Sequence, residues 1–294
     1  MRRTQINQFA WRTDIEHGDL LTEDHPARRP NAYRLKFDDQ TKLGINLVQL
    51  HEPYIREDIY APSGLLAVLL KKVIPDALCN DAFKLLRTVN GDPKNRPGII
   101  GENARQQGVR EKDGKLSPRV RVSSIVIKKY GGKADMLGYY RYRHPAKCDI
   151  TSWTRQKTDL YKAVRPFISK VDEIYRTFLP EQHAKQMEYV QTIPEKWRVP
   201  DTAFTTLYAL KNAPTATHVD NFDYPQGFGC MASLGNFRGG WLCFPRFRIA
   251  IDYQPGDLVL ADVHQVHANF PIYEDDMRIA CVFFCRKEQH KCPV

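Results

Sequence analysis

Hydrophobic and polar residues follow one another in short runs over the last third of the chain. Each run either alternates with a period of two or is continuously apolar, and Gly, Pro and Asn separate the runs, as is typical of strands joined by turns. Six strands are predicted in this way, over residues 204–212, 227–236, 239–245, 247–254, 257–263 and 278–286. Closely spaced strands of this kind indicate a β-sandwich or jelly roll.

Helical patterns come before these strands. Residues 74–89 place apolar side chains at helical spacing, and a turn sequence follows them. Residues 152–192 predict one or two long helices, and Pro166 is expected to kink or divide the first. Helices followed by strands indicate an α+β fold, with the helices packed on one face of the β structure.

The remaining segments are less regular. The first 60 residues are polar and contain a strand-like stretch at 31–39. Residues 94–115 are rich in Gly and basic residues and predict a loop, and the alternating residues 119–130 predict a strand. We expect residues 1–60 to form an N-terminal extension packed on a single domain over 61–294, with its β core at about 204–288.

Composition indicates the kind of partner that the protein binds and the compartment in which it is found. The formal charge of +10, with a pI of about 9.2, favours an anionic partner such as nucleic acid. The seven cysteines are odd in number, scattered and without a CxxC pair, which favours a reducing compartment over a zinc ribbon or a disulfide framework. No signal peptide is visible, and the longest apolar run, GLLAVLL, is too short to span a bilayer. A soluble, intracellular protein is expected.

Candidate chemistry starts at residues 212–227, NAPTATHVDNFDYPQG, which place His218 and Asp220 one residue apart. A 2-His-1-carboxylate triad holds non-haem Fe(II) on one face and leaves positions open for co-substrate and oxygen. The second histidine of such a triad comes from a distant strand, and the segment YQPGDLVLADVHQVHANFP offers both His264 and His267.

An arginine suited to bind the carboxylate of a co-substrate follows these residues in the sequence. Arg278 opens the last predicted strand, and a buried arginine binds a carboxylate such as that of 2-oxoglutarate through two hydrogen bonds. Taken alone, an HxD pair more often consists of polar residues at the surface, and a single arginine is more often an ion-pair partner. Their joint order within a jelly-roll pattern favours an iron and 2-oxoglutarate site.

The segments HVDNFD, GGWLCFP, PGDLVLADVHQVHANFP and RIACVFFCR resemble the TET/JBP family of Fe(II)- and 2-oxoglutarate-dependent nucleobase dioxygenases, which act on 5-methylcytosine or thymine. The resemblance covers about residues 75–288. It implies a double-stranded β-helix, the jelly-roll or cupin-like architecture, with Fe(II) as cofactor and 2-oxoglutarate and O2 as co-substrates.

By this resemblance His218, Asp220 and His267 are the iron ligands and Arg278 anchors 2-oxoglutarate. His267 is preferred to His264 because the family's ligand lies shortly before a proline, so His264 is expected to be structural. Asn212 occupies a position where related oxygenases often place an amide near the co-substrate, although an asparagine at a strand end can equally satisfy backbone groups.

The resemblance also implies a pocket for an extruded base. Asp223 is expected to accept from an exocyclic amino group, and Asn95 to read the base edge. Phe284 is expected to stack on the base, with ordinary core packing as the alternative. Arg286 occupies an edge-reading position where the family can carry histidine, and Pro97 stands where the family's Asn95 loop has glycine.

The implied reaction is oxidation of the methyl group of a base in double-stranded DNA, with the target nucleotide flipped out of the helix. 5-Methylcytosine is the first candidate for the substrate base. N6-Methyladenine is the alternative, because the same metal motif serves the oxidation of either base. Two less favoured alternatives are an RNA or protein hydroxylase and a catalytically silent DNA-binding module. The basic stretches 102–115, 139–147 and 285–291 are candidate phosphate contacts. A monomer in the nucleus is expected.

Overall fold

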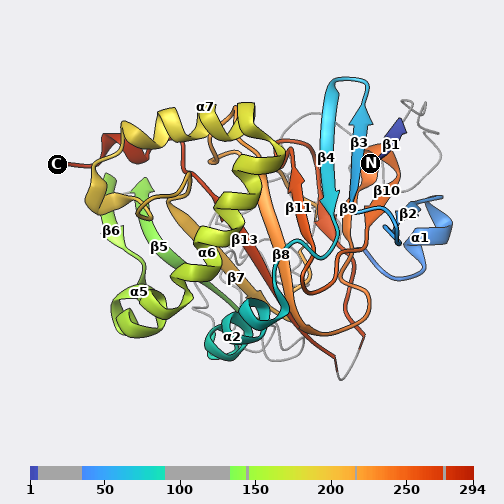
Figure 1. Ribbon diagram of the computed structural model, residues 1–294, viewed down its shortest axis with the longest axis horizontal. Helices are drawn as coiled ribbons and strands as arrows, with labels where there is room; N and C mark the ends of the chain where they lie inside the picture. The colour runs from blue at the N-terminus through green and yellow to red at the C-terminus, as the bar shows by residue number, and fades with distance from the viewer. Residues whose placement is uncertain (6–34, 90–132, 144–145, 216, 274–275) are drawn as a thin grey trace, which may run out of the picture.

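Two facing β-sheets and a layer of helices make up the described part of the chain (Figure 1). The computed structural model describes residues 1–5, 35–89, 133–143, 146–215, 217–273 and 276–294. The large sheet has the strand order β1 (Arg2–Gln5), β3 (Arg56–Ala61), β4 (Gly64–Leu70), β11 (Leu258–Ala261), β8 (Gly229–Asn236), β13 (Met277–Phe284), β7 (Thr206–Lys211), β5 (Lys133–Arg143) and β6 (Ala146–Ile150). The small sheet has the order β12 (Ala268–Asn269), β9 (Leu242–Phe244), β10 (Ile249–Ile251) and β2 (Asn46–Val48).

The six strands predicted over the last third of the chain are confirmed. They correspond to β7, β8, β9, β10, β11 and β13, each within or one residue beyond its predicted range. Buried side chains from the two sheets meet in one cluster that includes Leu69, Val259, Leu242 and Ile251, so the sheets pack face to face. This is the jelly-roll arrangement expected from the sequence.

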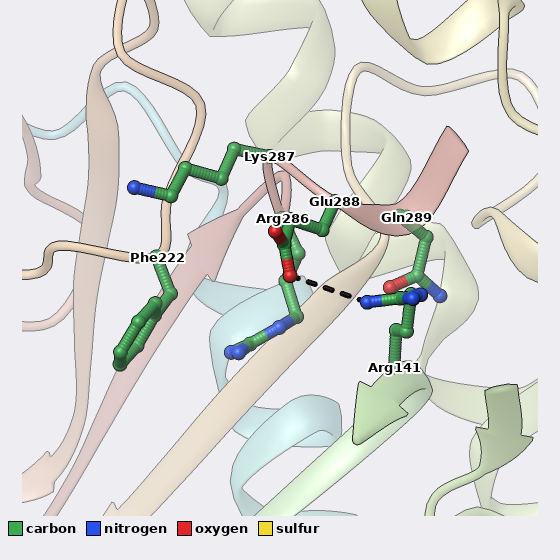
Figure 2. A pocket seen from close by; sticks show the side chains of 6 residues that line it. All are labelled: Arg141, Phe222, Arg286, Lys287, Glu288 and Gln289. Atoms are coloured by element: carbon green, nitrogen blue, oxygen red, sulfur yellow. Dashed lines mark hydrogen bonds and ion pairs between the residues drawn. The ribbon is translucent and has the colours of Figure 1, made fainter. Parts of the chain in front are cut away.

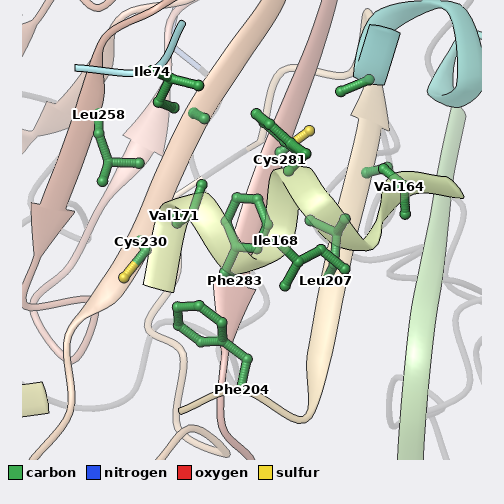
Figure 3. Packing of buried hydrophobic residues seen from close by; sticks show 14 of the residues in the cluster. Ile74, Val164, Ile168, Val171, Phe204, Leu207, Cys230, Leu258, Cys281 and Phe283 are labelled. Carbon is green, nitrogen blue, oxygen red and sulfur yellow. The ribbon is translucent and has the colours of Figure 1, made fainter. Parts of the chain in front are cut away.

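Helices cover the other face of the large sheet, as predicted. They are α2 (Asp76–Leu86), α5 (Ser152–Gln156), α6 (Thr158–Phe178) and α7 (Pro180–Gln191). In α6, the buried residues Val164, Ile168 and Val171 recur every three or four positions and form one apolar stripe. Figure 3 shows this stripe against Phe283 and Leu207 of the sheet. Among the described helices, none is both long enough and apolar enough to cross a membrane.

Pro166 does not divide the helix. The structure keeps α6 continuous through it, and the helical breaks fall instead at Lys157 and Leu179. A proline inside a helix costs about 3 kcal/mol. Burying Val164, Phe167 and Ile168 contributes about 1.5–3 kcal/mol each. The burial therefore outweighs the cost, and the helix continues.

The N-terminal region contributes more to the sheets than its polar sequence indicates. The run GLLAVLL is β4, which lies between β3 and β11 with its last five residues buried. Strand β2 pairs in parallel with β10 of the small sheet. The described strands before residue 60 thus belong to both sheets, and a division at 60 falls inside β3.

Two predictions for the N-terminal half have other outcomes. The described residues 35–39 of the strand-like stretch form a turn that leads into α1 (Asp39–Lys42), because the Asp39 carboxylate accepts a hydrogen bond from the Lys36 backbone N–H at 2.8 Å. The prediction of a loop at 94–115 and a strand at 119–130 lies outside the described residues.

The cysteine pattern is also corrected. Cys148 in β6 and Cys292 near the C-terminus form a disulfide across 144 residues of sequence. Their partnership depends on the C-terminal segment lying beside the edge strand β6, which spacing alone does not reveal. The five other cysteines are buried thiols, in agreement with their apolar surroundings.

Phe283 tests the packing between α6 and the large sheet. Its ring centroid lies 5.6 Å from those of both Phe167 and Phe204. Phe283→Ala is expected to lower the free energy of unfolding by about 3–5 kcal/mol, measured by urea denaturation. Met277→Ala, at an exposed position of the same strand, should change it by less than about 0.5 kcal/mol. Equal losses in both variants would contradict this packing.

Candidate metal centre

Three ligand-type side chains meet between the sheets. The structure gathers His218, Asp220 and His267, each with a potential ligand atom within 4.8 Å of the others. The side chains are buried, and the two Nε2 atoms lie 3.7 and 3.6 Å from the Asp220 carboxylate oxygens. These separations exceed a hydrogen bond and suit three ligands that surround one ion.

Backbone pairing brings the two histidines together. His218 and His267 donate their N–H groups to each other's carbonyl oxygens at 2.9 Å, as opposite residues of an antiparallel ladder do. The Asp220 N–H donates to the Val263 carbonyl at 3.0 Å and extends the contact by two residues. Because side chains alternate along an extended segment, His218 and Asp220 point to the same side.

The donor set fits iron(II). The Nδ1 atom of His267 lies 2.9 Å from the Gln265 carbonyl oxygen, which fixes a proton on Nδ1 and leaves Nε2, the atom facing Asp220, as a metal ligand. Two imidazoles and one carboxylate on one face form the set used by non-haem iron oxygenases. Phe244 of the small sheet lies 6.1 Å from the His267 ring and closes one side of the site.

His264 has a different role. Its backbone N–H donates to the Asp262 carboxylate at 3.0 Å, and its Nδ1 lies 3.2 Å from the same oxygen. This hydrogen bond raises the pKa of the His264 imidazole. A higher pKa favours the protonated ring, which does not bind metals. Among the described residues, the ligand cluster contains His267 and not His264.

Arg278 occupies the expected site for an anion. Its side chain is 2 % exposed, and its guanidinium donates to the hydroxyl oxygens of Ser233, at 3.1 Å, and Tyr253. Among the residues that the structure describes, no Asp or Glu carboxylate forms an ion pair with it. A buried cation with only neutral partners is costly, so the position favours a carboxylate ligand.

The backbone around Arg278 is built to leave room for its side chain. Gly240 has a φ of +67°, and a Cβ there would lie 2.9 Å from the Arg278 Cδ. Asn212 holds the strand itself: its amide oxygen accepts from the Arg278 N–H at 2.7 Å and its amide nitrogen donates to the Asp276 carbonyl at 2.9 Å. Asn212 thus has the backbone role that the sequence left open, and its contact with co-substrate stays a prediction.

The predicted base-pocket residues are distributed unevenly. Asp223 is buried, three residues beyond Asp220, and its backbone pairs with that of Arg286. Phe284 is 2 % exposed and packs with Tyr208, Leu210 and neighbouring alanines, so the structure shows its core-packing alternative. Its contact with a base stays a prediction. Asn95 lies outside the described residues.

Sequence reasoning missed several residues of this region. Tyr253 and Ser233 bind Arg278, and Tyr140 and Phe222 flank Arg286. Tyr140 lies in a basic, aromatic stretch that the sequence does mark as a phosphate candidate, and Phe222 lies within HVDNFD. The other two carry no local signal, because only the packing of the sheets brings them to the arginine.

Facing sheets, a buried 2-His-1-carboxylate cluster and a buried unmatched arginine together define the class of iron(II)- and 2-oxoglutarate-dependent oxygenases. The family model Tet_JBP, the oxygenase domain of the 2OGFeDO superfamily, matches residues 135–287. The chain therefore belongs to the Tet_JBP family. This membership implies Fe(II), with 2-oxoglutarate and O2 as co-substrates.

Curated proteins that are similar to this chain are much longer than it is. Thymine dioxygenase JBP1 of Leishmania braziliensis is 34 % identical over 169 residues, covering 53 % of this chain and 20 % of that protein. Thymine dioxygenase JBP1 of Crithidia fasciculata is 31 % identical over 185 residues, covering 59 % and 22 %. The chain thus spans about a fifth of the length of these relatives.

A solved structure supports the fold. The structure of NgTET1 in complex with 5mC DNA matches with a TM-score of 0.54 and 15 % identity, over 86 % of this chain and 89 % of that one. The double-stranded β-helix expected from the sequence is confirmed.

Iron binding distinguishes the two candidate histidines. His267→Ala removes a ligand and is expected to weaken Fe(II) binding by more than the roughly 10- to 100-fold lost with a supporting partner. His264→Ala should retain tight binding, because His264 lies outside the cluster. Anaerobic isothermal titration calorimetry measures both. Loss of binding in His264→Ala alone would reassign the ligand.

Gly240→Ala tests the arginine site. The added Cβ displaces the Arg278 side chain, so the Kd for 2-oxoglutarate should rise about 10- to 100-fold, the range for losing a hydrogen bond to a charged group. Gly44→Ala is the matched control, because Gly44 has a similar φ of +59° and nothing within 4 Å of an added Cβ. Calorimetric titration of both variants gives the comparison, and equal Kd values would exclude the displacement.

Proposed function

We propose that this chain oxidises the methyl group on C5 of a pyrimidine in DNA, with 5-methylcytosine as the leading substrate and thymine as the second. The buried cluster of His218, Asp220 and His267, within a matched Tet_JBP domain, is the observation that carries the proposal. The relatives named thymine dioxygenase and the solved complex with 5mC DNA support the choice of a C5-methyl pyrimidine over N6-methyladenine.

Each residue has a defined part in this reaction. His218, Asp220 and His267 would hold iron(II), and Arg278 would orient 2-oxoglutarate through its carboxylate. Bound iron supplies the oxidation, in which one oxygen atom of O2 enters the methyl group as hydroxyl and the other enters succinate as 2-oxoglutarate loses CO2. The Gln265 carbonyl keeps His267 in the required tautomer, and Tyr253 and Ser233 keep Arg278 in place.

Asp223 supports cytosine as the first choice. A carboxylate accepts a hydrogen bond from the exocyclic amino group of cytosine and meets an acceptor oxygen at the same position in thymine. Thymine still offers a donor at its ring N3–H, which a carboxylate can accept. Thymine is the second candidate because relatives of this chain are named thymine dioxygenase. The depth of Asp223, 6 % exposed and three residues from Asp220, favours a base contact over a surface role.

The partner and context are part of the proposal. The formal charge of +10 favours DNA as the partner. A C5-methyl group reaches a buried site after its nucleotide is flipped out of the helix, which costs about a few kcal/mol.

We propose a monomer that acts in the nucleus. We also propose a single oxygenase domain over residues 61–294, with its β-helix core at about 204–288, to whose sheets the extension over residues 1–60 adds strands.

A nucleoside assay tests the substrate. Matched duplexes with 5-methylcytosine or N6-methyladenine, both of which contain thymine, are incubated with the full chain, Fe(II), ascorbate and 2-oxoglutarate and then analysed by mass spectrometry. We expect 5-hydroxymethylcytosine or its oxidised successors. Product from thymine alone would reverse the order of the two pyrimidines.

Asp220→Ala tests the metal ligand, and Asp159→Ala is its matched control. Asp220→Ala removes a ligand and should lower product formation by about 10²-fold or more. Asp159 is fully exposed on α6, and its replacement should change nothing measurable. Succinate formation without any change in the bases would remove the DNA substrate and leave the iron site intact. Loss of methyladenine to adenine would move the substrate to the purine.

A further inference from the structure

A small polar pocket lies just beyond the C-terminal end of β13. It is lined by Arg141, Phe222, Arg286, Lys287, Glu288 and Gln289 (Figure 2). Three cations and one aromatic ring in this lining suit one part of a polymer, such as a single base or phosphate of a nucleic acid strand.

Cations and aromatic rings alternate around the pocket. The Arg286 guanidinium carbon lies 4.1 Å from the ring centroid of Tyr140 and 5.7 Å from that of Phe222. The Lys287 ammonium lies 5.8 Å from the Phe222 centroid. Figure 2 shows Arg286 and Lys287 reaching toward the side where Phe222 lies. Proteins that bind single strands combine cations along the backbone with rings on which bases stack.

Phe222 is exposed although it is a large apolar side chain. Its residue is 40 % exposed, while its backbone carbonyl is held by the Lys287 N–H at 3.0 Å. The backbone is thus fixed and the ring is offered to solvent. An ordered, exposed ring beside two cations is preorganised for stacking.

The pocket is connected to the metal centre through a short stretch of chain. Phe222 follows the ligand Asp220 by two residues, and the next residue, Asp223, pairs its backbone with Arg286. This short connection favours the nucleotide adjacent to an extruded one as the occupant of the pocket.

Charge agrees with such an occupant. Three cations and one carboxylate line the pocket, so its formal charge is +2. The carboxylate, Glu288, lies 3.2 Å from Arg141 and draws that guanidinium toward itself. Lys287 and Arg286 face the exposed ring, on the side away from this ion pair (Figure 2).

We propose that this pocket binds the nucleotide next to the target nucleotide, with Phe222 stacked on its base and Lys287 and Arg141 on its phosphates. The inference rests on the proposed action on DNA and adds a second contact that is separate from the metal centre. The gain from stacking on Phe222 offsets part of the stacking that the strand loses when its neighbour is extruded.

Binding measurements with two variants separate the two contacts. The probes are a fluorescein-labelled duplex with one 5-methylcytosine and the corresponding single strand, titrated with the full chain at several salt concentrations. Phe222→Ala is expected to weaken binding about 5- to 100-fold without changing the salt dependence. Lys287→Gln is expected to reduce the slope of log K against log salt by about 0.7–0.9, the value for one lost phosphate contact.

Glu288→Gln is a variant that is expected to strengthen DNA binding instead of weakening it. It removes the carboxylate that neutralises Arg141, so binding is expected to tighten roughly two- to fivefold, the range for one exposed charge pair. A variant that merely damages the fold does not bind more tightly. Weaker or unchanged binding by Glu288→Gln would count against a phosphate contact by Arg141.

Two remote variants are matched controls. Tyr54 is an exposed ring in the turn before β3, near the opposite end of the large sheet, and Lys162 is an exposed cation on α6. If Phe222→Ala and Lys287→Gln bind like Tyr54→Ala and Lys162→Gln while the wild-type chain still oxidises DNA bases, the pocket inference fails alone. If the wild-type chain binds neither probe at low salt, the DNA substrate fails with it.

Discussion

The pairing of His218 with His267 is the interaction on which the site depends. Two backbone hydrogen bonds, each worth about 0.5–1.5 kcal/mol, join segments that are far apart in sequence and set the distance between two imidazoles. Because these bonds use main-chain atoms, they leave the side chains available for a metal. The facing sheets supply the rest, since they exclude water and bring Phe244 beside the His267 ring.

Strand β13 connects the parts of the protein through its two faces. Ile279, Cys281 and Phe283 point toward the helices and form the core, while Arg278 points between the sheets. The chain then continues past the end of the strand to Arg286. At about 3.3 Å per residue, these two arginines are separated by roughly 25 Å along the chain. One stretch of chain therefore carries both the buried Arg278 and a residue of the polar pocket, and the structural core fixes their spacing.

The sequence predicts the six strands of the last third of the chain, the helical layer and the histidines and aspartate of the cluster, because each has a local pattern. Choosing His267 over His264 needed the family resemblance, and the structure explains the choice by the hydrogen bonds of Asp262. The partnership of Cys148 with Cys292 was not predictable, since it depends on which edges meet. Of the kink or division predicted at Pro166, the division is wrong, because burial along α6 outweighs the cost of the proline.

The parallel pairing of β2 with β10 has a practical consequence for anyone who shortens this chain. A fragment that starts at residue 61 would lose β1, β2 and nearly all of β3. The hydrogen-bonding edges of β4 and β10 would then face solvent, and β4 carries the apolar run GLLAVLL. Strands of other molecules can pair with open apolar edges, so such a fragment would tend to aggregate even though it keeps His218, Asp220 and His267.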